Sequence, residues 1–590
     1  MWKQKDPKLK TVKDVVMKNT GLSEYDLLHD DNTYEIYTLG PVIEKFKEAA
    51  NKKITVHIVG DYDVDGISAT DIIEIVCRYL SIPYTKRVPN RHKEGYGLNR
   101  NIVLEYSDGI LFTVDNGIMA FDAVDLAKKN GLFVIVTDHH QARADHSVPD
   151  ADILIDPSAF PETADWNKYC GAGIAYKIAE KLLPENSYEL KCCNGLAAIG
   201  TIADMVDLES DNKKIVLSGI KYLEDYKTRT PGVGALLRAS GSTMGITSTG
   251  ISFGLGPMIN ACGRLEGMTI SVTEDPMSHT AEHDCVASAN LPLDLLTKNF
   301  TSYKDADKFA LDIKAINDTR KRLKKEQMKI VDEIIDKEML SYDAPIIVYS
   351  PNLHLGIVGI LAGEIVEKYG VPAIVLTSDS KGTGIKGSAR SAGNVNMKEL
   401  LDSVSDDLLG YGGHAGAAGL SLELSKLQKF REDTNEKLAD VVFEKPEMTY
   451  DLEIQEGNVE KLIDEVNKYQ PYGMGNPEPV FLIRNFKPMP MFGSKDIFKI
   501  IPGTDHIIFQ GKLVKAPAFF LREKYESLTE KHDYMDIIGT VQRSFNAKGY
   551  PEATFLIKDL AAAENPPVLK KTSLFEMMSE KVNQKKEVKA

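Results

Sequence analysis

Long apolar segments are missing from this chain. No run of about 18 or more apolar residues occurs, so no transmembrane helix is expected. The first residues, MWKQKDPKLK, are charged and lack the apolar core of a signal peptide, which argues against secretion. No internal repeat of long period is visible, so a repeat architecture is not expected.

Paired cysteines are also missing. None of the six cysteines stands in a CxxC pair, which argues against a zinc site. Isolated cysteines without a signal peptide suit a reducing cytoplasm, where they stay thiols. The six are Cys77, Cys170, Cys192, Cys193, Cys262 and Cys285.

An excess of positive charge is the third absence. The formal net charge is −15 and the pI is about 5.4. This argues against non-specific, charge-driven binding of nucleic acid. A focused basic channel stays possible because local clusters of Lys and Arg decide it, and carboxylates that bind divalent metals also add to the negative count.

The 590 residues exceed what one core supports and suffice for about three or four domains. Short apolar runs at 54–60, 110–114, 132–137 and 151–155 alternate with helix-like segments, which predicts a parallel sheet covered on both faces. We expect an N-terminal segment (1–50), this α/β domain (51–300), a connecting helix (301–340), a second α/β domain (341–442), a linker (443–477), a small β barrel (478–562) and a Lys-rich tail (563–590).

Acidic residues follow the ends of the predicted parallel strands. The four runs end at Asp61, Asp115, Asp138 and Asp156. Ligands of open α/β sheets bind beyond the carboxyl ends of the strands, so these acids should converge on one edge. A single acid after a strand is usually a helix N-cap. Four together, with Asp63 and Asp65 beside the first, make capping the weaker explanation.

The convergent acids predict a metal centre. Asp61, Asp63, Asp65, Asp115 and His139 could share two ions, and an oxygen-rich set with histidine suits Mn²⁺ or Mg²⁺ better than zinc. Two such ions clamp the attacking and leaving oxygens of a phosphoryl displacement. A Ca²⁺ site of the EF-hand type is the alternative. It fails because position 12 of the loop is an isoleucine and no helix is expected before the loop.

Two glycine-rich stretches imitate a dinucleotide fingerprint. GTGIKG (382–387) matches GxGxxG, and GYGGHA (410–415) matches its GxGxxA variant. Neither lies in a convincing βαβ unit with an acid about 20 residues further on, so we reject dinucleotide binding.

The motifs GDYDVDG, TVDNG, TDHH and AAIGTIADMVDL, in this order, resemble the DHH phosphoesterase superfamily. Further motifs resemble the RecJ family of single-stranded-DNA-specific exonucleases within it. They are VPNRHKEGYGLN, CGAGIAYKIA, GPMINACGRL, HLGIVGILAGEIVEKYGVPAIVL, KGSARS, GYGGHAGAAG and YGMGNPEPVF, and they span roughly residues 50 to 560. The resemblance implies a DHH domain, a DHH-associated domain and an oligonucleotide-binding domain in place of the three folded regions above.

The resemblance also implies roles for single residues. The metal ligands would be Asp61, Asp63, Asp65, Asp115, His139 and Asp204; the catalytic residues Asp63, Asp65, Asp115, His139, His140 and His414; and the substrate-binding residues Arg91, Arg264, Ser388, Arg390, Gly412, Gly413 and His414. Asp204 would be unremarkable without the family. We expect Asp138 to orient a histidine, as metal-bound histidines need, and Asp156 to be structural.

Two features depart from the family pattern. Met258 stands where relatives commonly have Arg, which weakens one expected contact to the DNA backbone, and residues 274–300 fit the usual spacing poorly. In the predicted barrel, basic and aromatic residues together suit a single-strand groove, although Phe519 and Phe520 could simply be core.

The resemblance implies a metal-dependent 5′→3′ exonuclease that degrades single-stranded DNA to nucleoside 5′-monophosphates in DNA repair or recombination. Two divalent ions, Mn²⁺ by preference or Mg²⁺, would be the cofactors. Its partners would be the DNA and a helicase or single-strand-binding protein, in the cytoplasm and with no membrane. Two alternatives stay open: a DHH phosphodiesterase acting on short oligonucleotides or cyclic dinucleotides, and an inactive DNA-binding relative.

Overall fold

The computed structural model describes residues 2–564 apart from residues 31, 144, 226–228, 242–244, 276–279, 299, 301, 380–383, 444–446, 491–495, 502–503, 529–533 and 547–548. The chain divides into two compact units. One comprises residues 29–447 and 471–477, and the other comprises residues 1–28, 448–470 and 478–590. The predicted Lys-rich tail lies outside the described residues from position 565 onward. No helix among the described residues is long and apolar enough to cross a membrane.

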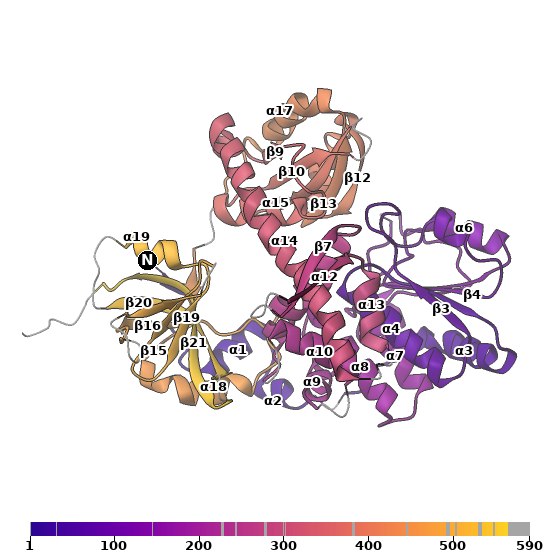
Figure 1. Cartoon of the computed structure of the whole chain (residues 1–590), viewed down its shortest axis with the longest axis horizontal. Coiled ribbons are helices and arrows are strands. Elements are labelled where there is room, and N and C mark those ends of the chain that lie inside the picture. The colour runs from indigo at the N-terminus through magenta and orange to yellow at the C-terminus, as the bar shows by residue number, and fades with distance from the viewer. Residues whose placement is uncertain are drawn as a thin grey trace, which may run out of the picture. The chain divides into compact units, whose positions relative to one another are not determined.

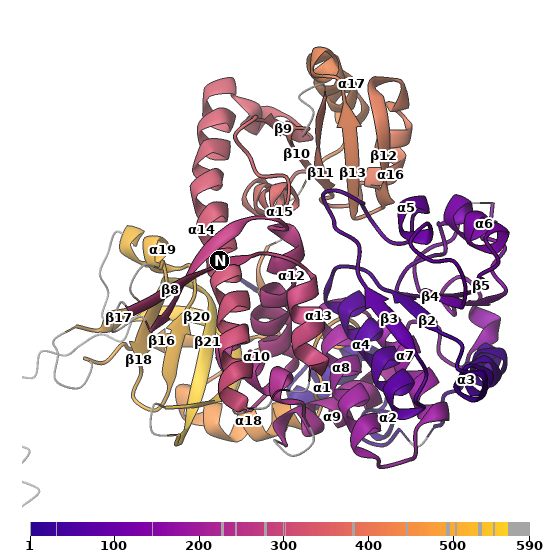
Figure 2. The same cartoon turned by 45° about the vertical axis from the view of Figure 1, so that its right-hand side comes forward.

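The larger unit begins with a parallel sheet of five strands in the order β3-β2-β4-β5-β6. Figure 2 shows β3, β2, β4 and β5 of this sheet. The sheet is buried on both sides because side chains along each strand alternate between two apolar cores. Phe112 faces the core under α3, α4 and α7, whereas Leu111 faces the core under α5 and α6. The predicted sheet is thus confirmed. The elements are β2 (Val56–Val59), β3 (Tyr84–Arg87), β4 (Ile110–Val114), β5 (Phe133–Thr137), β6 (Ile153–Ile155), α3 (Gly40–Lys52), α4 (Val64–Tyr79), α5 (Arg100–Val103), α6 (Phe121–Lys129) and α7 (Gly171–Leu182).

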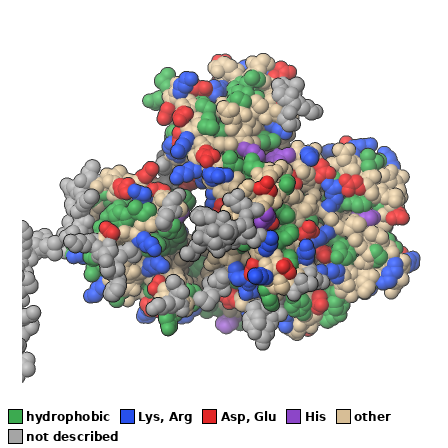
Figure 3. All heavy atoms as spheres, in the orientation of Figure 1, with side chains coloured by type: hydrophobic (Ala, Val, Ile, Leu, Met, Phe, Trp, Pro, Cys, Tyr) green, Lys and Arg blue, Asp and Glu red, His purple; other side chains and the backbone are tan. Residues whose placement is uncertain are grey.

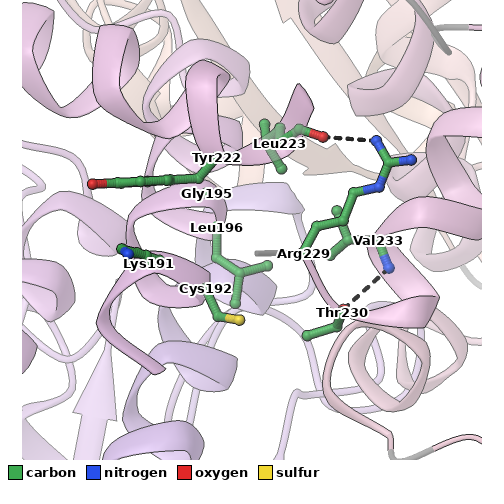
Figure 4. Close-up of a pocket in the computed structure, with 9 residues that line it drawn as sticks. All are labelled: Lys191, Cys192, Gly195, Leu196, Tyr222, Leu223, Arg229, Thr230 and Val233. Carbon is green, nitrogen blue, oxygen red and sulfur yellow. Dashed lines mark hydrogen bonds between the residues drawn. The ribbon is translucent and has the colours of Figure 1, made fainter. Parts of the chain in front are cut away.

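A group of helices follows the sheet. It contains α8 (Tyr188–Ala203), α9 (Ser210–Glu224), α10 (Pro231–Ser240), a π-helical turn (Ile251–Leu255), α12 (Gly256–Arg264) and α13 (Asn290–Thr297), with a hairpin of β7 (Thr269–Asp275) and β8 (Thr280–Val286). A cavity of about 10 Å³ remains between α8, α9 and α10 (Figure 4). Leu196 and Val233 line it, and Arg229 donates a hydrogen bond of 2.7 Å to the Leu223 carbonyl at its edge. Such a volume holds about one water molecule, so this cavity is a packing gap.

The helix α14 (Tyr303–Glu338) connects the two lobes of the larger unit (Figure 1). Its first turn is capped by Ser302, whose hydroxyl accepts a hydrogen bond from the Asp305 amide. The predicted connecting helix is therefore present, with 36 residues. Because its apolar positions, among them Ile313, Ile316 and Ile335, recur at helical spacing, the helix buries one face along its length.

The second lobe is a sheet in the order β12-β13-β11-β10-β9, with β9 and β10 parallel and the other pairs antiparallel (Figure 2). The strands place SARS at the end of β11 and GGH at the end of β12. The elements are β9 (Ile346–Tyr349), α15 (Val358–Tyr369), β10 (Ala373–Ser378), β11 (Ile385–Arg390), α16 (Met397–Asp402), β12 (Leu408–His414), β13 (Ala417–Leu422) and α17 (Leu427–Leu438).

The smaller unit is built on a seven-stranded sheet in the order β15-β16-β20-β21-β19-β18-β17. The described strands do not close into a barrel, because β15 and β17 remain edges, so the expected barrel is an open sheet. The strands are β15 (Leu452–Ile454), β16 (Phe481–Phe486), β17 (Phe498–Ile500), β18 (Ile507–Gln510), β19 (Lys515–Ala518), β20 (Met535–Phe545) and β21 (Pro551–Ala562). Phe519 and Phe520 are 45% and 71% exposed, so they are not core residues.

The first residues of the chain belong to this smaller unit. The strand β1 (Lys3–Gln4) pairs in parallel with β14 (Thr449–Tyr450), and Trp2 Nε1 donates a hydrogen bond of 3.0 Å to Asp559. The helices α1 (Val12–Thr20) and α18 (Val459–Asn467) contact each other. The unit therefore joins segments that are more than 400 positions apart in the chain, such as Trp2 and Asp559.

Candidate functional site

The first acidic motif forms a tight loop between β2 and α4. Asp63 is the N-cap of α4, and its carboxylate accepts hydrogen bonds of 3.1 Å from the amides of Asp65 and Gly66. A side chain at Gly66 would come within 2.5 Å of the Asp61 amide, so only glycine lets the helix start this close to the loop. The loop therefore packs the Asp61 and Asp65 carboxylates, each 2% exposed, against the end of the sheet.

The predicted metal ligands come together at this edge. Three sets have ligand atoms within 4.8 Å of one another: Asp61, Asp63 and Asp115; Asp65, His139 and Asp204; and Asp115, His139 and His140. All six predicted metal ligands therefore lie in one cluster, and His140 joins them. Asp115 and His139 each occur in two sets, which places them where two ions could be shared.

Asp115 stands in an unusual backbone conformation. It follows β4 with φ of 61°, in the left-handed region that costs free energy for a residue with a side chain. Gly171 packs against it, since a Cβ at Gly171 would lie 2.4 Å from the Asp115 Cβ. The fold accepts this strain to point the carboxylate into the cluster, as active sites often do.

Asp65 is held by the start of a helix. Its two oxygens accept hydrogen bonds of 2.6 and 2.8 Å from the amides of Gly171 and Ala172, in the first turn of α7. The partial positive charge of a helix N-terminus stabilises an ionised carboxylate there. Asp65 is thereby fixed in position and faces His139 and Asp204.

Asp138 orients the histidine pair that follows it. It is 1% exposed, and its Oδ1 accepts hydrogen bonds from His140 Nδ1 (2.7 Å) and from the amides of His139 and His140. Its Oδ2 accepts one from the Ile118 amide. Both oxygens are thus engaged, and Asp138 belongs to none of the three ligand sets. This geometry supports the expected orienting role.

The charge of Asp138 changes the titration of His140. Burial opposes protonation of His140, but the hydrogen bond and charge of Asp138 outweigh it and raise the pKa of His140 to about 9. The opposite holds for His139, where burial and the charge of His140 lower the pKa. His139 is therefore a neutral imidazole suited to a metal, while His140 carries a positive charge in the metal-free protein.

The cluster fits divalent metal ions. Asp61 Oδ1, Asp115 Oδ1 and His139 Nε2 are buried and have no hydrogen-bond partner among the described residues. Burial and mutual repulsion raise the pKa values of Asp61, Asp115 and Asp204 well above the usual range. Cations would give these atoms partners and reduce the repulsion between the carboxylates. An acid-rich set with one or two histidines suits Mn²⁺ or Mg²⁺. The loop follows a strand, so it is not an EF-hand.

Beside the metal ligands lies a cavity of about 360 Å³ between the two lobes of the larger unit. Five of the predicted substrate residues line it: Arg91, Ser388, Arg390, Gly412 and Gly413. A Cβ at Gly412 would meet nothing within 4 Å, so packing alone does not require glycine there. An approaching phosphate backbone does give a reason for it. Figure 3 shows histidine side chains at the surface where these lobes meet.

The remaining predicted substrate residues, His414 and Arg264, lie near the cavity without lining it. Burial and the charges of Arg390 and His140 lower the pKa of His414. Burial, and then the charges of Arg91, Arg320 and Arg390, lower the pKa of Arg264 to about 9. Both therefore sit in the electric field of the site.

Arginines concentrate uncompensated positive charge at the cavity. Arg390 donates a hydrogen bond of 2.7 Å to the Ser388 hydroxyl, and the Arg91 guanidinium lies 5.0 Å from the centre of the Tyr62 ring. Arg91, Arg264, Arg320 and Arg390 form no ion pair with a carboxylate among the described residues. Arginines without acids, next to a metal cluster, are suited to phosphate.

Sequence reasoning missed several residues of the site. Tyr62 and Tyr96 line the cavity with ring centres 6.4 Å apart, and the Tyr96 hydroxyl contacts His140 Nδ1 at 3.2 Å. Their signal was present, because Tyr62 lies inside the DxDxD motif and Tyr96 inside EGYG. Arg320 on α14 does not line the cavity, but its charge acts on Arg264. It carried no signal, since a charged residue on a long charged helix looks like an exposed one.

Asp156, expected to be structural, lies outside the ligand sets. Its Oδ1 accepts a hydrogen bond of 2.9 Å from the Ala159 amide, which fixes the turn after β6. Burial raises the pKa of Asp156 to about 8. No contact of Asp156 with the ligand atoms is found among the described residues.

The fold and the site together define a DHH phosphoesterase. Residues 55–201 match the DHH family, N-terminal domain; residues 343–440 match the DHHA1 domain; and residues 450–578 match the RecJ OB domain.

Comparison with individual relatives shows which family of DHH phosphoesterases the chain belongs to. The single-stranded-DNA-specific exonuclease RecJ of Haemophilus influenzae is 30% identical over 483 residues, which cover 76% of this chain and 78% of that protein. RecJ of Bacillus subtilis is 32% identical over 461 residues, 77% of this chain but only 55% of that longer protein. The crystal structure of Thermus thermophilus RecJ in complex with Mn²⁺ superimposes with a TM-score of 0.72, at 23% identity, over 94% of this chain and 76% of that one. The chain belongs to the RecJ family of single-stranded-DNA-specific exonucleases.

Proposed function

We propose that the protein is a metal-dependent exonuclease that digests single-stranded DNA from the 5′ end and releases nucleoside 5′-monophosphates. The observation that carries this proposal is the contact between the two halves of the site. A cluster of metal ligands adjoins a cavity that is lined by unpaired arginines and glycines. The volume of about 360 Å³ is small for a ligand site and suits one unpaired nucleotide.

The acids and His139 would hold two divalent ions, Mn²⁺ by preference or Mg²⁺. When bound, the ions supply electrostatic stabilisation of the phosphate and lower the pKa of water. The carboxylate of Asp115, directed into the cluster by its left-handed backbone, belongs to two of the ligand sets. Asp65 is kept in place by the α7 amides.

The chain's own residues bind and orient the substrate. Arg390 and Ser388 already form a hydrogen-bonded pair, and with Arg91 they would receive the terminal 5′-phosphate. His140, kept positive by Asp138, would hold an oxygen of the phosphate to be cleaved, and His414 of the second lobe would approach the same phosphate. Holding the phosphate from both lobes gives the near-attack geometry that a displacement needs.

The direction of digestion follows from this assignment. If the arginines bind a 5′-terminal phosphate, the scissile bond is the next one along the strand, and the product is one nucleoside 5′-monophosphate. The test is digestion of strands labelled at the 5′ or the 3′ end, with Mn²⁺, Mg²⁺ or a chelator. Early release of the 5′ label as a mononucleotide is expected. Early release of the 3′ label would overturn the proposal.

Two other functions are less well supported. Enzymes that cleave cyclic dinucleotides or very short oligonucleotides do not need a separate single-strand-binding unit, whereas residues 450–578 match the RecJ OB domain. An inactive DNA-binding relative would not need the six predicted ligands, which are present and close together here.

The cellular setting is proposed from the substrate. Free single strands with a 5′ end arise when a helicase unwinds DNA, and they are covered by single-strand-binding protein, so either could be a partner in repair or recombination. The six cysteines are buried thiols outside any disulfide, which suits a reducing cytoplasm.

A further inference from the structure

The last carbonyl of α12 is held from two sides. It belongs to Arg264, which ends the helix beside the cavity. The final carbonyls of a helix have no partner inside the helix and need one elsewhere. His92 supplies it, because its Nε2 lies 3.1 Å from the Arg264 oxygen and a carbonyl can only accept. His92 thereby caps α12 at Arg264, whose guanidinium is a predicted substrate-binding group.

The second lobe closes on the same carbonyl. A Cβ at Gly356 would lie 1.7 Å from the Arg264 oxygen, so the backbone of the second lobe passes directly against it and requires glycine there. His354 fixes this turn. Its Nδ1 accepts a hydrogen bond of 3.1 Å from the Gly356 amide, and its own amide donates one of 2.9 Å to Gln327 Oε1 on α14.

The two histidines touch each other and share a protonation state. Their ring centres lie 5.9 Å apart with the planes at 85°, an edge-to-face contact. His92 donates through Nε2 and His354 accepts through Nδ1, so each ring has one settled tautomer when neutral. Burial lowers both pKa values, helped by Arg91 and Lys386 at His92 and by His92 at His354. Both rings are therefore neutral near pH 7.

We propose that His92 is a positioning residue that fixes the end of α12, and so the Arg264 guanidinium, for the 5′-terminal phosphate. Gly356 lies against the Arg264 carbonyl and His354 against the His92 ring, so this position depends on closure of the second lobe. The inference rests on the proposed function and on the substrate-binding role that the family resemblance implies for Arg264. The proposal adds His92 as a residue that acts on the substrate through Arg264 and that has no part in metal binding.

The hydrogen bond makes the proposal testable by substitution in the full-length protein. His92→Phe keeps an aromatic ring but removes the donor, whereas His92→Gln keeps an N–H donor at a similar reach. For a 5′-phosphorylated oligonucleotide, His92→Phe should raise KM about fivefold, the size of one lost neutral hydrogen bond. Its kcat should change less than about twofold, because no reacting group is removed. His92→Gln should restore most of the wild-type KM.

A double-mutant cycle identifies the route of the effect. If His92 acts through Arg264, then His92→Phe should change KM little in an Arg264→Gln background. Equal effects of His92→Phe in both backgrounds, or a wild-type KM for His92→Phe, would overturn the proposal. Mn²⁺ affinity and melting temperature are measured for each variant, and a loss of both in His92→Phe with no rescue by His92→Gln would assign His92 a purely structural role. Failure of wild-type protein to digest the strand would instead overturn the proposed function.

Discussion

Asp138 Oδ1 and His140 Nδ1 lie 2.7 Å apart, in a buried hydrogen bond at the carboxyl end of the sheet. The Asp138 carboxylate also accepts hydrogen bonds from three backbone amides, so it cannot turn away from the histidine. This pair keeps the imidazole next to the metal ligands in one orientation and, in the metal-free protein, in its charged form. The Asp138–His140 pair should therefore make the rate of cleavage depend on pH.

Asp138→Asn should shift the pH profile of cleavage toward acid. The charge of Asp138 raises the pKa of His140, to about 9 in the metal-free protein, so it extends the pH range over which His140 is protonated. The variant loses the charge that raises it, and the pKa returns toward the ordinary value of about 6.5. Activity at pH 8 should fall about 10- to 100-fold, the usual effect of removing a supporting carboxylate. Single-turnover rates from pH 5.5 to 9.5 test this, and an unchanged profile would contradict the role given to Asp138.

Asp115→Ala should abolish activity without unfolding the protein. The carboxylate belongs to two ligand sets, so cleavage should fall at least about 100-fold, beyond the loss from a supporting group. In chelator the variant should melt no lower than wild type, because one of several mutually repelling buried carboxylates has gone. Mn²⁺ should raise the melting temperature of wild type more than that of the variant. Full turnover by the variant would refute the two-metal site.

Arg390→Ala should weaken binding of the strand end. Removing a guanidinium from a charged hydrogen bond costs about 1.5–3 kcal/mol, or about 10- to 150-fold in KM for a 5′-phosphorylated oligonucleotide. Mn²⁺ affinity should not change, because Arg390 is not a ligand. The matched control is Arg238→Ala, which removes an arginine whose partner is the exposed Asp307. The assignment fails if a 5′-hydroxyl strand and a 5′-phosphate strand respond equally to Arg390→Ala.

Lys86→Met should destabilise the first domain strongly. The Lys86 ammonium is buried between Asp71 (2.9 Å) and Glu74 (2.7 Å) and donates to the Leu293 carbonyl on α13. Removing it leaves the buried Asp71 without a cationic partner among the described residues, a cost of about 3–5 kcal/mol in the free energy of unfolding, whereas Glu74 keeps Arg78 at 3.6 Å. The exposed pair Lys47–Glu44 is the control, where Lys47→Ala should cost less than about 1 kcal/mol. Urea denaturation measures both.

Asp71 and Glu74 raise the pKa of Lys86, so the stability that this ion pair contributes is complete at neutral pH. It declines only as pH rises above the pKa of an unfolded lysine.

The sequence predicted the parts of the site that depend on local order. Asp61, Asp115 and Asp138 each follow a buried strand, and parallel strands bring their carboxyl ends to one edge. Asp204 could be found only by resemblance, because it caps the end of α8, more than 60 residues after Asp138. Tyr96 and His92 were quoted within a motif but given no role, since their contacts depend on loops and lobes that meet in space.

The smaller unit shows a different limit of sequence reasoning. Its strands were predicted, but neither their open sheet nor the contribution of residues 1–28 was, because edge pairing and contacts over more than 400 positions leave no local pattern. The same limit applied to Phe519 and Phe520, whose exposure is set by a corner after β19.

Removal of the smaller unit should separate strand binding from hydrolysis. A truncation near Tyr472 alone would leave β15 and α18 without the strands they contact, β16, β20 and β21, so the chain is better cut to residues 29–447. This keeps every proposed metal ligand and the arginine-lined cavity. The cut also removes residues 471–477, whose Met474 carbonyl accepts from the Leu208 amide, so melting temperature is measured first. The shortened protein should still hydrolyse short oligonucleotides in Mn²⁺.

Long strands should distinguish the two proteins by their salt dependence. Each phosphate contact to a single strand contributes a slope of about −0.7 in log affinity against log salt, because counterions are released on binding. If exposed aromatic and basic residues of the smaller unit follow the strand, the full-length protein should show the steeper slope and the tighter binding. The measurement is binding of a long and a short oligonucleotide across a salt series, in chelator to prevent digestion. Equal affinity and equal slope for the long strand would mean that the smaller unit is not a DNA platform. It would then act as a docking unit for a protein partner, because an OB-type sheet with exposed aromatics such as Phe520 still offers a binding surface.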